Sequence, residues 1–343
     1  MSVSTSRPFD RSPTDGPPLS GWERVSFEVS RVCVYGLSRV VGLGGLYQFG
    51  RVFGTLEWLC DYKRRRRVAR QVAIVTGGGG AAGSGGGAGG GDAARGGDGA
   101  GGGDAARGGR RGLQRSVLRH FVRVRCDKLM FLIMDMLPRE TLLERFEVKN
   151  RCVLDEALSR GRGMYMALSH LGSHHLVISL LIELGYTRIA GVRDAKMGAQ
   201  WRFIQHKHEQ KGRTRVEYFF SNSFPREIFR RFEKNYIIGS LIDAHTRRGD
   251  RVRTMEVEVF GERRAFLTGP FQIAMRCKAP IVQTFVLSKP NFRYEVQFGE
   301  PLVKADESCG GAAGDAALRR AVDVYAKGVE AFARRYPCHI SRY

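Results

Sequence analysis

The chain has 343 residues with 43% hydrophobic content, which is enough for one sizeable core with appendages or for two small domains. Its 56 basic and 34 acidic side chains give a formal net charge of +22, which favours anionic partners such as phosphate-bearing lipids, an anionic membrane surface, nucleic acid or an acidic carrier protein. Seven cysteines lie far apart without a CxxC pair, which argues against a disulfide framework or a zinc cage and indicates reduced thiols in a protein that faces the cytosol.

The N-terminal part combines a polar tail with an apolar segment. Residues 1–20 are polar, contain prolines and lack the hydrophobic region of a signal peptide, so we expect a disordered tail. Val32–Cys60 is apolar on average, but two arginines interrupt it, and the stretch between them is shorter than the about 20 apolar residues that span a bilayer. The basic run 63–67 follows directly. We therefore predict that 21–76 is a helical segment that associates with an anionic membrane face; the alternative is a core helix hairpin with a solvated arginine run.

Residues 77–112 are of low complexity, mostly Gly and Ala, and GGGDAARGG occurs at 89–97 and again at 101–109. The segment has almost no apolar side chains to bury, so it is predicted to be a flexible insert. So short a repeat indicates sequence slippage and not a structural repeat. The remaining residues, 113–343, are left to form the main domain.

Helix and strand patterns fill this main domain. Two helices come first, Leu113–Leu137, which is basic and amphipathic, and Glu147–Ser159. Strand-like runs follow at Met164–Ser169, Arg188–Val192, Val216–Phe220, Ile237–Asp243, Met255–Phe260, Ile281–Leu287 and Tyr294–Phe298. Helix-like runs lie at Ser173–Leu184, Gly198–Gln210, Pro225–Lys234, Gly269–Arg276 and Asp315–Arg335. The alternation predicts an α/β fold, namely a layered α/β/α domain with a mixed, largely parallel sheet, preceded by N-terminal amphipathic helices.

The first candidate for chemistry is His170, where the first of these strands gives way to a turn and a helix. The imidazole has a resting pKa suited to a general base near neutrality. Gly172 lets a substrate approach, and Ser173 and His174 begin the helix, whose free N–H groups suit a developing anion. We therefore assign Gly172, Ser173 and His174 to substrate binding. The alternative is a satisfied structural histidine in an ordinary turn.

Asp243 closes an apolar run, where a carboxylate is costly unless it is paired, either with an arginine or with an imidazole. Ligands of such folds bind beyond the carboxyl ends of the strands, so His170 and Asp243 are expected to share one rim. A weaker interpretation is a metal site formed by His170 and His174 with Asp243 or His245. It is weaker because position 171 is Leu, where zinc peptidases need Glu. No metal site is expected.

Two further places suit an anionic substrate. Arg193 follows a predicted strand and offers a guanidinium that can clamp a phosphate through two hydrogen bonds. Thr268 and Gly269 open a predicted helix whose N–H groups suit an acyl or phosphate oxygen. The alternative for Arg193 is a solvated surface arginine, and the alternative for Thr268 and Gly269 is an ordinary start of a helix.

Several segments together, in order and spacing, resemble the bacterial lipid A biosynthesis lauroyl/myristoyl acyltransferases of the lysophospholipid acyltransferase superfamily. These segments are VLDEALSRGRG (153–163), ALSHLGSHH (167–175), IGSLID (238–243), VFG (259–261) with LTGPFQIA (267–274), and APIVQTF (279–285). The resemblance implies a membrane-associated O-acyltransferase without a cofactor. Its donor would be a fatty acyl thioester of acyl carrier protein or coenzyme A, and its acceptor a hydroxyl of a lipid or glycolipid. It also implies a peripheral or monotopic protein on the cytoplasmic face of the inner membrane.

The family signature is His, four residues, then Asp or Glu. His170 matches its first position, but His175 stands where the acid is expected. An acid there would stabilise the imidazolium formed during proton transfer, which a second imidazole does not do. Three outcomes follow: His175 orients His170 without charge, Asp243 supplies the charge, or the protein is a catalytically impaired lipid-binding relative. A nucleic-acid-binding protein is suggested by the charge alone, without a recognisable module, so no specific nucleic-acid partner is expected.

Overall fold

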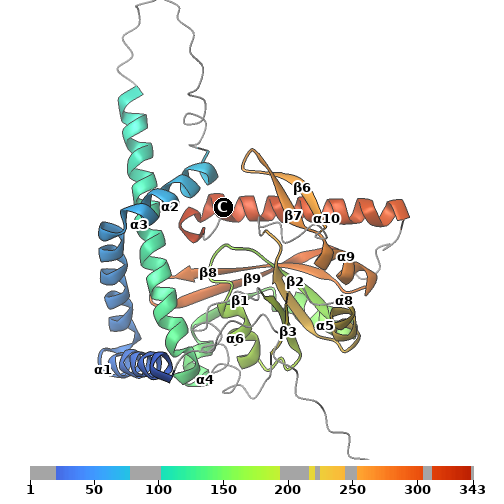
Figure 1. The fold of residues 1–343 in the computed structure, drawn as a ribbon, viewed down its shortest axis with the longest axis horizontal. Coiled ribbons are helices and arrows are strands. Elements are labelled where there is room, and N and C mark those ends of the chain that lie inside the picture. Colours follow the sequence, from blue (N-terminus) through green and yellow to red (C-terminus); the bar gives the residue numbers. More distant parts are fainter. Residues whose placement is uncertain are drawn as a thin grey trace, which may run out of the picture.

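A computed structural model describes residues 21–77, 102–193, 216–220, 225–243, 253–303 and 311–340 of the chain. Its N-terminal part is a helical unit of α1 (Gly21–Cys60), α2 (Tyr62–Val75) and α3 (Gly102–Ile133), in which α1 and α2 each pack against α3 (Figure 1). Helix α3 begins inside the segment predicted to be a flexible insert, while the predicted tail 1–20 and residues 78–101 lie outside the described part.

Helix α1 bends at Gly42, whose φ of 70° interrupts the helical backbone. Each half is fixed to α3 or its C-terminal extension. In the first half, the buried Arg31 donates to the carbonyl oxygen of Leu132 at 2.9 Å and pairs with Asp135 in the short helix η1 (Met134–Met136). In the second half, Gly54 lies so close to Val122 that a Cβ would overlap the α3 backbone. No helix in the described ranges is both long and apolar enough to cross a membrane.

The chain then forms α4 (Arg139–Leu143), β1 (Phe146–Lys149) and α5 (Arg151–Ser159). The predicted helix Glu147–Ser159 is therefore wrong in its first turn, since β1 occupies that place and pairs in parallel with a later strand. Asn150 separates the two elements with a left-handed φ of 56°. Its side chain donates to the carbonyl oxygen of Phe298 at 3.1 Å, a long-range contact that local periodicity does not reveal.

Seven described strands form one twisted sheet in the order β1-β9-β8-β2-β5-β3-β4, and all neighbours are parallel except β8 and β9. The strands after β1 are β2 (Met164–Leu168), β3 (Ile189–Arg193), β4 (Glu217–Phe220), β5 (Ile237–Leu241), β8 (Ile281–Lys289) and β9 (Arg293–Val303). A separate antiparallel pair consists of β6 (Thr254–Val259) and β7 (Glu262–Leu267). Strand β7, which contains two arginines, was not predicted from the sequence.

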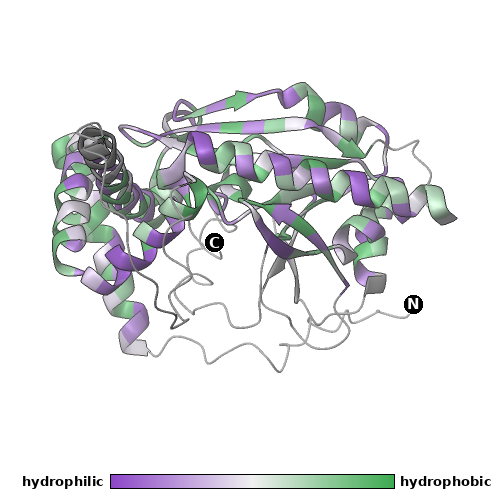
Figure 2. Cartoon of the chain, turned by 90° about the horizontal axis from the view of Figure 1, so that it is seen from above, coloured by the Kyte–Doolittle hydropathy of each residue, from purple (hydrophilic) through white to green (hydrophobic). Residues whose placement is uncertain are grey.

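Helices cover both faces of the sheet, which confirms the predicted layered α/β/α class with a mixed, largely parallel sheet. The fully buried strand β2 shows why: Met164 and Met166 pack with α3, α5 and α6 (Leu176–Glu183), while Tyr165 and Ala167 pack with the opposite layer. That layer contains the β6–β7 pair, α9 (Gly269–Arg276) and α10 (Gly311–Arg335) (Figure 1). Green and purple residues alternate along α10 in Figure 2, as expected for a helix with one face on the core.

Helix α8 (Pro225–Glu233) also matches its prediction, whereas the helix expected at Gly198–Gln210 lies outside the described residues. After α10 the chain forms the short helix η2 (Pro337–His339), which packs against α3, so that the C-terminal end returns to the middle of the molecule (Figure 1).

Candidate active site

The candidate site begins where β2 ends and the chain turns toward α6. His170 lies two residues beyond the strand, and Gly172 follows in the left-handed region with a φ of 63°. A Cβ at Gly172 would collide with the carbonyl oxygen of Val286 in β8. Only glycine therefore lets the turn pass this close to β8, which is a packing requirement and not an opening for substrate.

Strand β5 brings Asp243 to the same place. Strands β2 and β5 are parallel neighbours in the register Leu168↔Leu241, and each is followed two residues later by a site residue. The ring Nδ1 of His170 lies 2.8 Å from Oδ1 of Asp243, and the backbone N–H of His170 donates to Oδ2 at 2.7 Å. The shared rim expected from the sequence is thus confirmed.

Burial sets the roles that this pair can have. The Asp243 side chain is fully buried, whereas the His170 side chain remains 16% exposed. An ionised carboxylate only accepts hydrogen bonds, so the proton of a neutral His170 is placed on Nδ1 and Nε2 is left with its lone pair. A ring held this way can take a proton from a bound hydroxyl, and the carboxylate then stabilises the imidazolium.

His174 and His175 extend the cluster away from this pair. The ring centroids of His170 and His174 are 6.0 Å apart, and those of His174 and His175 are 5.8 Å apart. Burial, reinforced by the neighbouring imidazoles, lowers the pKa of His174 to about 3, so this ring is neutral near pH 7. The His175 ring packs edge-on against the ring of Phe131 in α3, with the two ring centroids 5.0 Å apart. The ring of His170 is therefore oriented by Asp243, and a role for His175 stays a prediction.

The turn itself is already hydrogen-bonded. The N–H of Gly172 donates to the carbonyl oxygen of His339 at 2.8 Å, and that of Ser173 donates to Val286 at 3.0 Å. Ser173 is fully buried, and its hydroxyl donates to Asp127. These groups hold the turn in place, so the geometry does not support the predicted oxyanion contact through the amides of Gly172 and Ser173.

Asp127 was missed by sequence reasoning. It is the one acid between residues 113 and 133, in an otherwise basic stretch, and it is buried. Its partner Arg123 stands one helical turn earlier, with Nη1 2.9 Å from the carboxylate. A lone acid on the apolar side of a basic helix is the signal that would have indicated a buried ion pair.

The other predicted substrate-binding residues surround the same edge of the sheet. Arg193 ends β3, next to β5, but its side chain lies outside what the structure describes. Thr268 precedes α9 and is buried, with its hydroxyl 3.2 Å from the carbonyl oxygen of Arg253. The N–H of Leu267 donates to Ile242, which places the start of α9 beside the strand that carries Asp243. The predicted roles of Arg193, Thr268 and Gly269 stay predictions.

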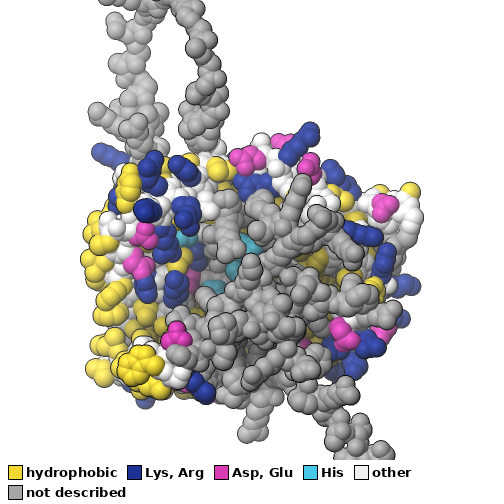
Figure 3. Space-filling model, viewed as in Figure 1, with side chains coloured by type: hydrophobic (Ala, Val, Ile, Leu, Met, Phe, Trp, Pro, Cys, Tyr) yellow, Lys and Arg dark blue, Asp and Glu magenta, His cyan; other side chains and the backbone are white. Residues whose placement is uncertain are grey.

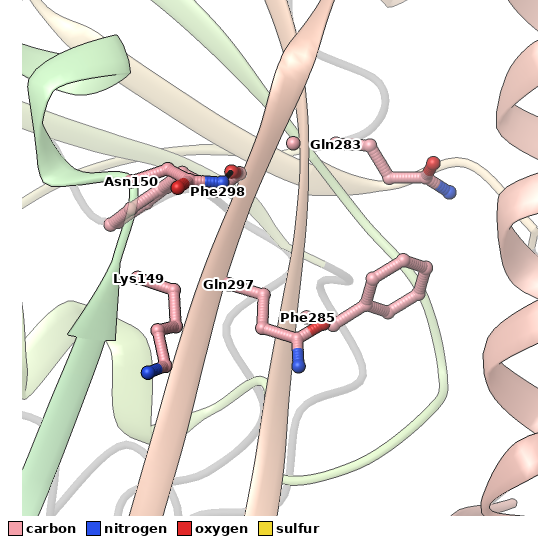
Figure 4. Close-up of a pocket in the computed structure, with 7 residues that line it drawn as sticks. Lys149, Asn150, Gln283, Phe285, Gln297 and Phe298 are labelled. Atoms are coloured by element: carbon pink, nitrogen blue, oxygen red, sulfur yellow. Dashed lines mark hydrogen bonds between the residues drawn. The ribbon is translucent and has the colours of Figure 1, made fainter.

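A pocket of about 400 Å³ lies elsewhere on the sheet, between the end of β1 and strands β8 and β9 (Figure 4). It is lined by Lys149, Asn150, Gln283, Phe285, Gln297, Phe298 and Gly299. Its lining includes neither His170 nor Asp243. Among the described residues, no group of three or more His, Cys, Asp or Glu side chains is arranged to hold a metal ion.

The chain matches the sequence model of a known protein family. Residues 115–323, more than half of the chain, match the sequence model of the bacterial lipid A biosynthesis acyltransferases. The matched stretch contains β2, the turn with His170, and β5 with Asp243 beyond its end. A search of curated proteins finds no match to the chain.

Proposed function

The chain belongs to the bacterial lipid A biosynthesis acyltransferase family, and we propose that it is an O-acyltransferase that moves a fatty acyl chain from a thioester to a hydroxyl of a lipid or glycolipid. The observation that carries this proposal is the pairing of a partly exposed His170 with a fully buried Asp243 at the carboxyl edge of the sheet. That pairing supplies a general base of fixed orientation together with a compensating negative charge.

The reaction begins when Nε2 of His170 takes the proton of the acceptor hydroxyl, as the acceptor oxygen attacks the thioester carbonyl carbon. A tetrahedral oxyanion forms, and Asp243 stabilises the imidazolium across the 2.8 Å contact. Collapse of the intermediate breaks the carbon–sulfur bond. The departing thiolate of acyl carrier protein or coenzyme A takes the proton from His170, which restores the neutral ring.

The pair also bears on the alternative of an impaired lipid-binding relative. That alternative rested on the absence of an acid at position 175. Asp243 approaches His170 from the neighbouring strand and accepts from its ring nitrogen, so a carboxylate is present although the linear motif lacks it. The geometry therefore favours a working catalyst.

Membrane association is the second part of the proposal. Large exposed hydrophobic side chains of the described residues concentrate on α1: Trp22, Val25, Val29, Val32, Val40, Val41, Phe49, Val52, Phe53, Leu56 and Leu59. Figure 3 shows a yellow, hydrophobic outer edge over α1, beside a dark blue column of Lys and Arg over α2 and α3. An apolar face flanked by positive charge suits a peripheral protein on an anionic leaflet, and we propose the cytoplasmic face of the inner membrane.

The proposal is tested by purifying the full chain and its His170→Ala variant in detergent. Each is incubated with ¹⁴C-palmitoyl thioesters of coenzyme A and of acyl carrier protein and with total lipid from the producing cells. We expect labelled lipid from the natural chain and a loss of at least about 1,000-fold in the variant, since it lacks the base. Equal labelling by both proteins would refute the assignment of His170.

A further inference from the structure

A buried polar cluster lies behind the catalytic turn. Arg123 and Asp127 of α3 form an ion pair whose side chains are 8% and 5% exposed. Oδ2 of Asp127 accepts from the hydroxyl of Ser173 in the turn and from that of Ser288 in β8, the latter at 2.9 Å. One carboxylate oxygen thus joins a helix, the turn and a strand.

The C-terminal segment supports the other side of the same turn. Leu171 pairs with Ile340 in an isolated antiparallel bridge, and Gly172 donates to His339. The segment is in turn held by α3, because Nε of Arg123 donates to the carbonyl oxygen of Cys338 at 3.0 Å. Arg123 and Asp127 therefore control both supports of the turn.

We propose that Ser173 is a positioning residue, through which the Arg123–Asp127 pair of α3 fixes the turn that carries His170. Burying an ion pair costs free energy that its own attraction repays only in part, so the pair is weak evidence for a role in stability. Its hydrogen bonds reach Ser173, three residues after the base in the same turn. A displacement of about 1 Å at a reacting group is enough to cost roughly 100-fold in rate.

The proposal rests on the proposed acyl transfer. It gives Ser173 a positioning role that an ordinary buried serine does not have. Three serines allow the comparison. Ser173 and Ser288 donate to the same carboxylate, but only Ser173 belongs to the turn. Ser169, next to His170 in sequence, is 1% exposed, and its hydroxyl has no hydrogen-bond partner in the described part of the chain.

The experiment compares Ser173→Ala, Ser288→Ala and Ser169→Ala in the full chain, with palmitoyl-coenzyme A as donor and total lipid as acceptor. For Ser173→Ala we expect kcat to fall about 10- to 100-fold with KM for the thioester unchanged, because the base is displaced while binding is kept. Ser288→Ala is expected to lower the melting temperature as much as Ser173→Ala, with kcat within about two-fold of the natural chain. Ser169→Ala serves as the control for loss of an unpartnered hydroxyl.

The outcomes separate this inference from the proposed function. If His170→Ala is inactive while the Ser173→Ala and Ser288→Ala variants lose kcat equally, the cluster is structural and the positioning role is refuted. An unchanged kcat in Ser173→Ala also refutes it. If His170→Ala is as active as the natural chain, the proposed function fails first, irrespective of the serine variants.

Discussion

Asp243 holds His170 by two hydrogen bonds, one from the ring and one from the backbone amide of the same residue. The side chain and the main chain of His170 are therefore fixed by a single carboxylate. This double contact requires the strands that carry the two residues to end in register, which the parallel pairing of β2 and β5 provides. The contact between His170 and Asp243 is thus a consequence of the sheet, although the two residues are far apart in sequence.

We expect Asp243→Asn to lower kcat by roughly 1,000- to 10,000-fold with little change in KM. The amide keeps the size of the carboxylate but has no charge to stabilise the imidazolium, and its NH2 group can favour the wrong tautomer of His170. Steady-state kinetics with palmitoyl-coenzyme A measures the effect. Asp155→Asn, at a half-exposed carboxylate on α5, is the matched control. Retention of more than a tenth of the activity would remove Asp243 from the mechanism.

Introducing the missing motif acid should not increase the proposed acyl transfer. We expect His175→Glu to leave kcat unchanged or to lower it, because Asp243 already contacts Nδ1 of His170 and the side chain at 175 packs on Phe131. A new carboxylate against that aromatic ring is poorly solvated. The same kinetic assay decides the point: a large gain in kcat would show that the natural chain is impaired by its histidine.

The contact between His170 and Asp243 could be anticipated from sequence because each residue follows an apolar run that is typical of a strand. The contacts that support the turn from behind could not be predicted. Gly172 is held by His339, and Asn150 is held by Phe298, through contacts across the whole domain that leave no local pattern. Strand β1 was missed for the same reason, since its four residues are defined by pairing with β9.

Gly172 and Gly261 provide a matched pair of left-handed glycines, with φ of 63° and 75°. A Cβ at Gly261 meets open space, whereas one at Gly172 collides with Val286. We expect Gly261→Ala to cost about 1 kcal/mol in the free energy of unfolding, from backbone strain alone. Gly172→Ala should cost clearly more and abolish transfer, because the turn must move. Equal melting temperatures for the two variants would contradict the close packing of the turn.

The exposed face of α1 predicts the behaviour of the protein on vesicles. Phe49, Phe53 and Leu56 are each more than 40% exposed. Their triple substitution by Ser should weaken binding to phosphatidylglycerol-containing vesicles by at least about ten-fold, since each side chain inserted into lipid contributes roughly 1–2 kcal/mol. Val324→Ser, an equally exposed position on α10, is expected to bind normally. Unchanged sedimentation of the triple variant with vesicles would exclude this face as the membrane contact.

Three buried histidines predict how stability depends on pH. Burial, with Arg123 and Arg64 nearby, lowers the pKa of His120 to about 3. Burial likewise lowers the pKa of His174 to about 3 and holds that of His339 well below its ordinary value. In the unfolded chain each ring takes a proton below pH about 6.5, so the unfolded state binds more protons than the folded state. The free energy of unfolding should therefore fall as the pH drops below about 6.5, with a limiting slope of about 1.4 kcal/mol per pH unit for each histidine.

Denaturant unfolding between pH 7 and pH 5 measures this slope. The range lies about or above the ordinary pKa values of carboxylates. His120→Gln should reduce this slope by the contribution of about one proton, whatever its effect on the free energy of unfolding at a given pH. Parallel curves for the variant and the natural chain would show that His120 is protonated in the folded protein.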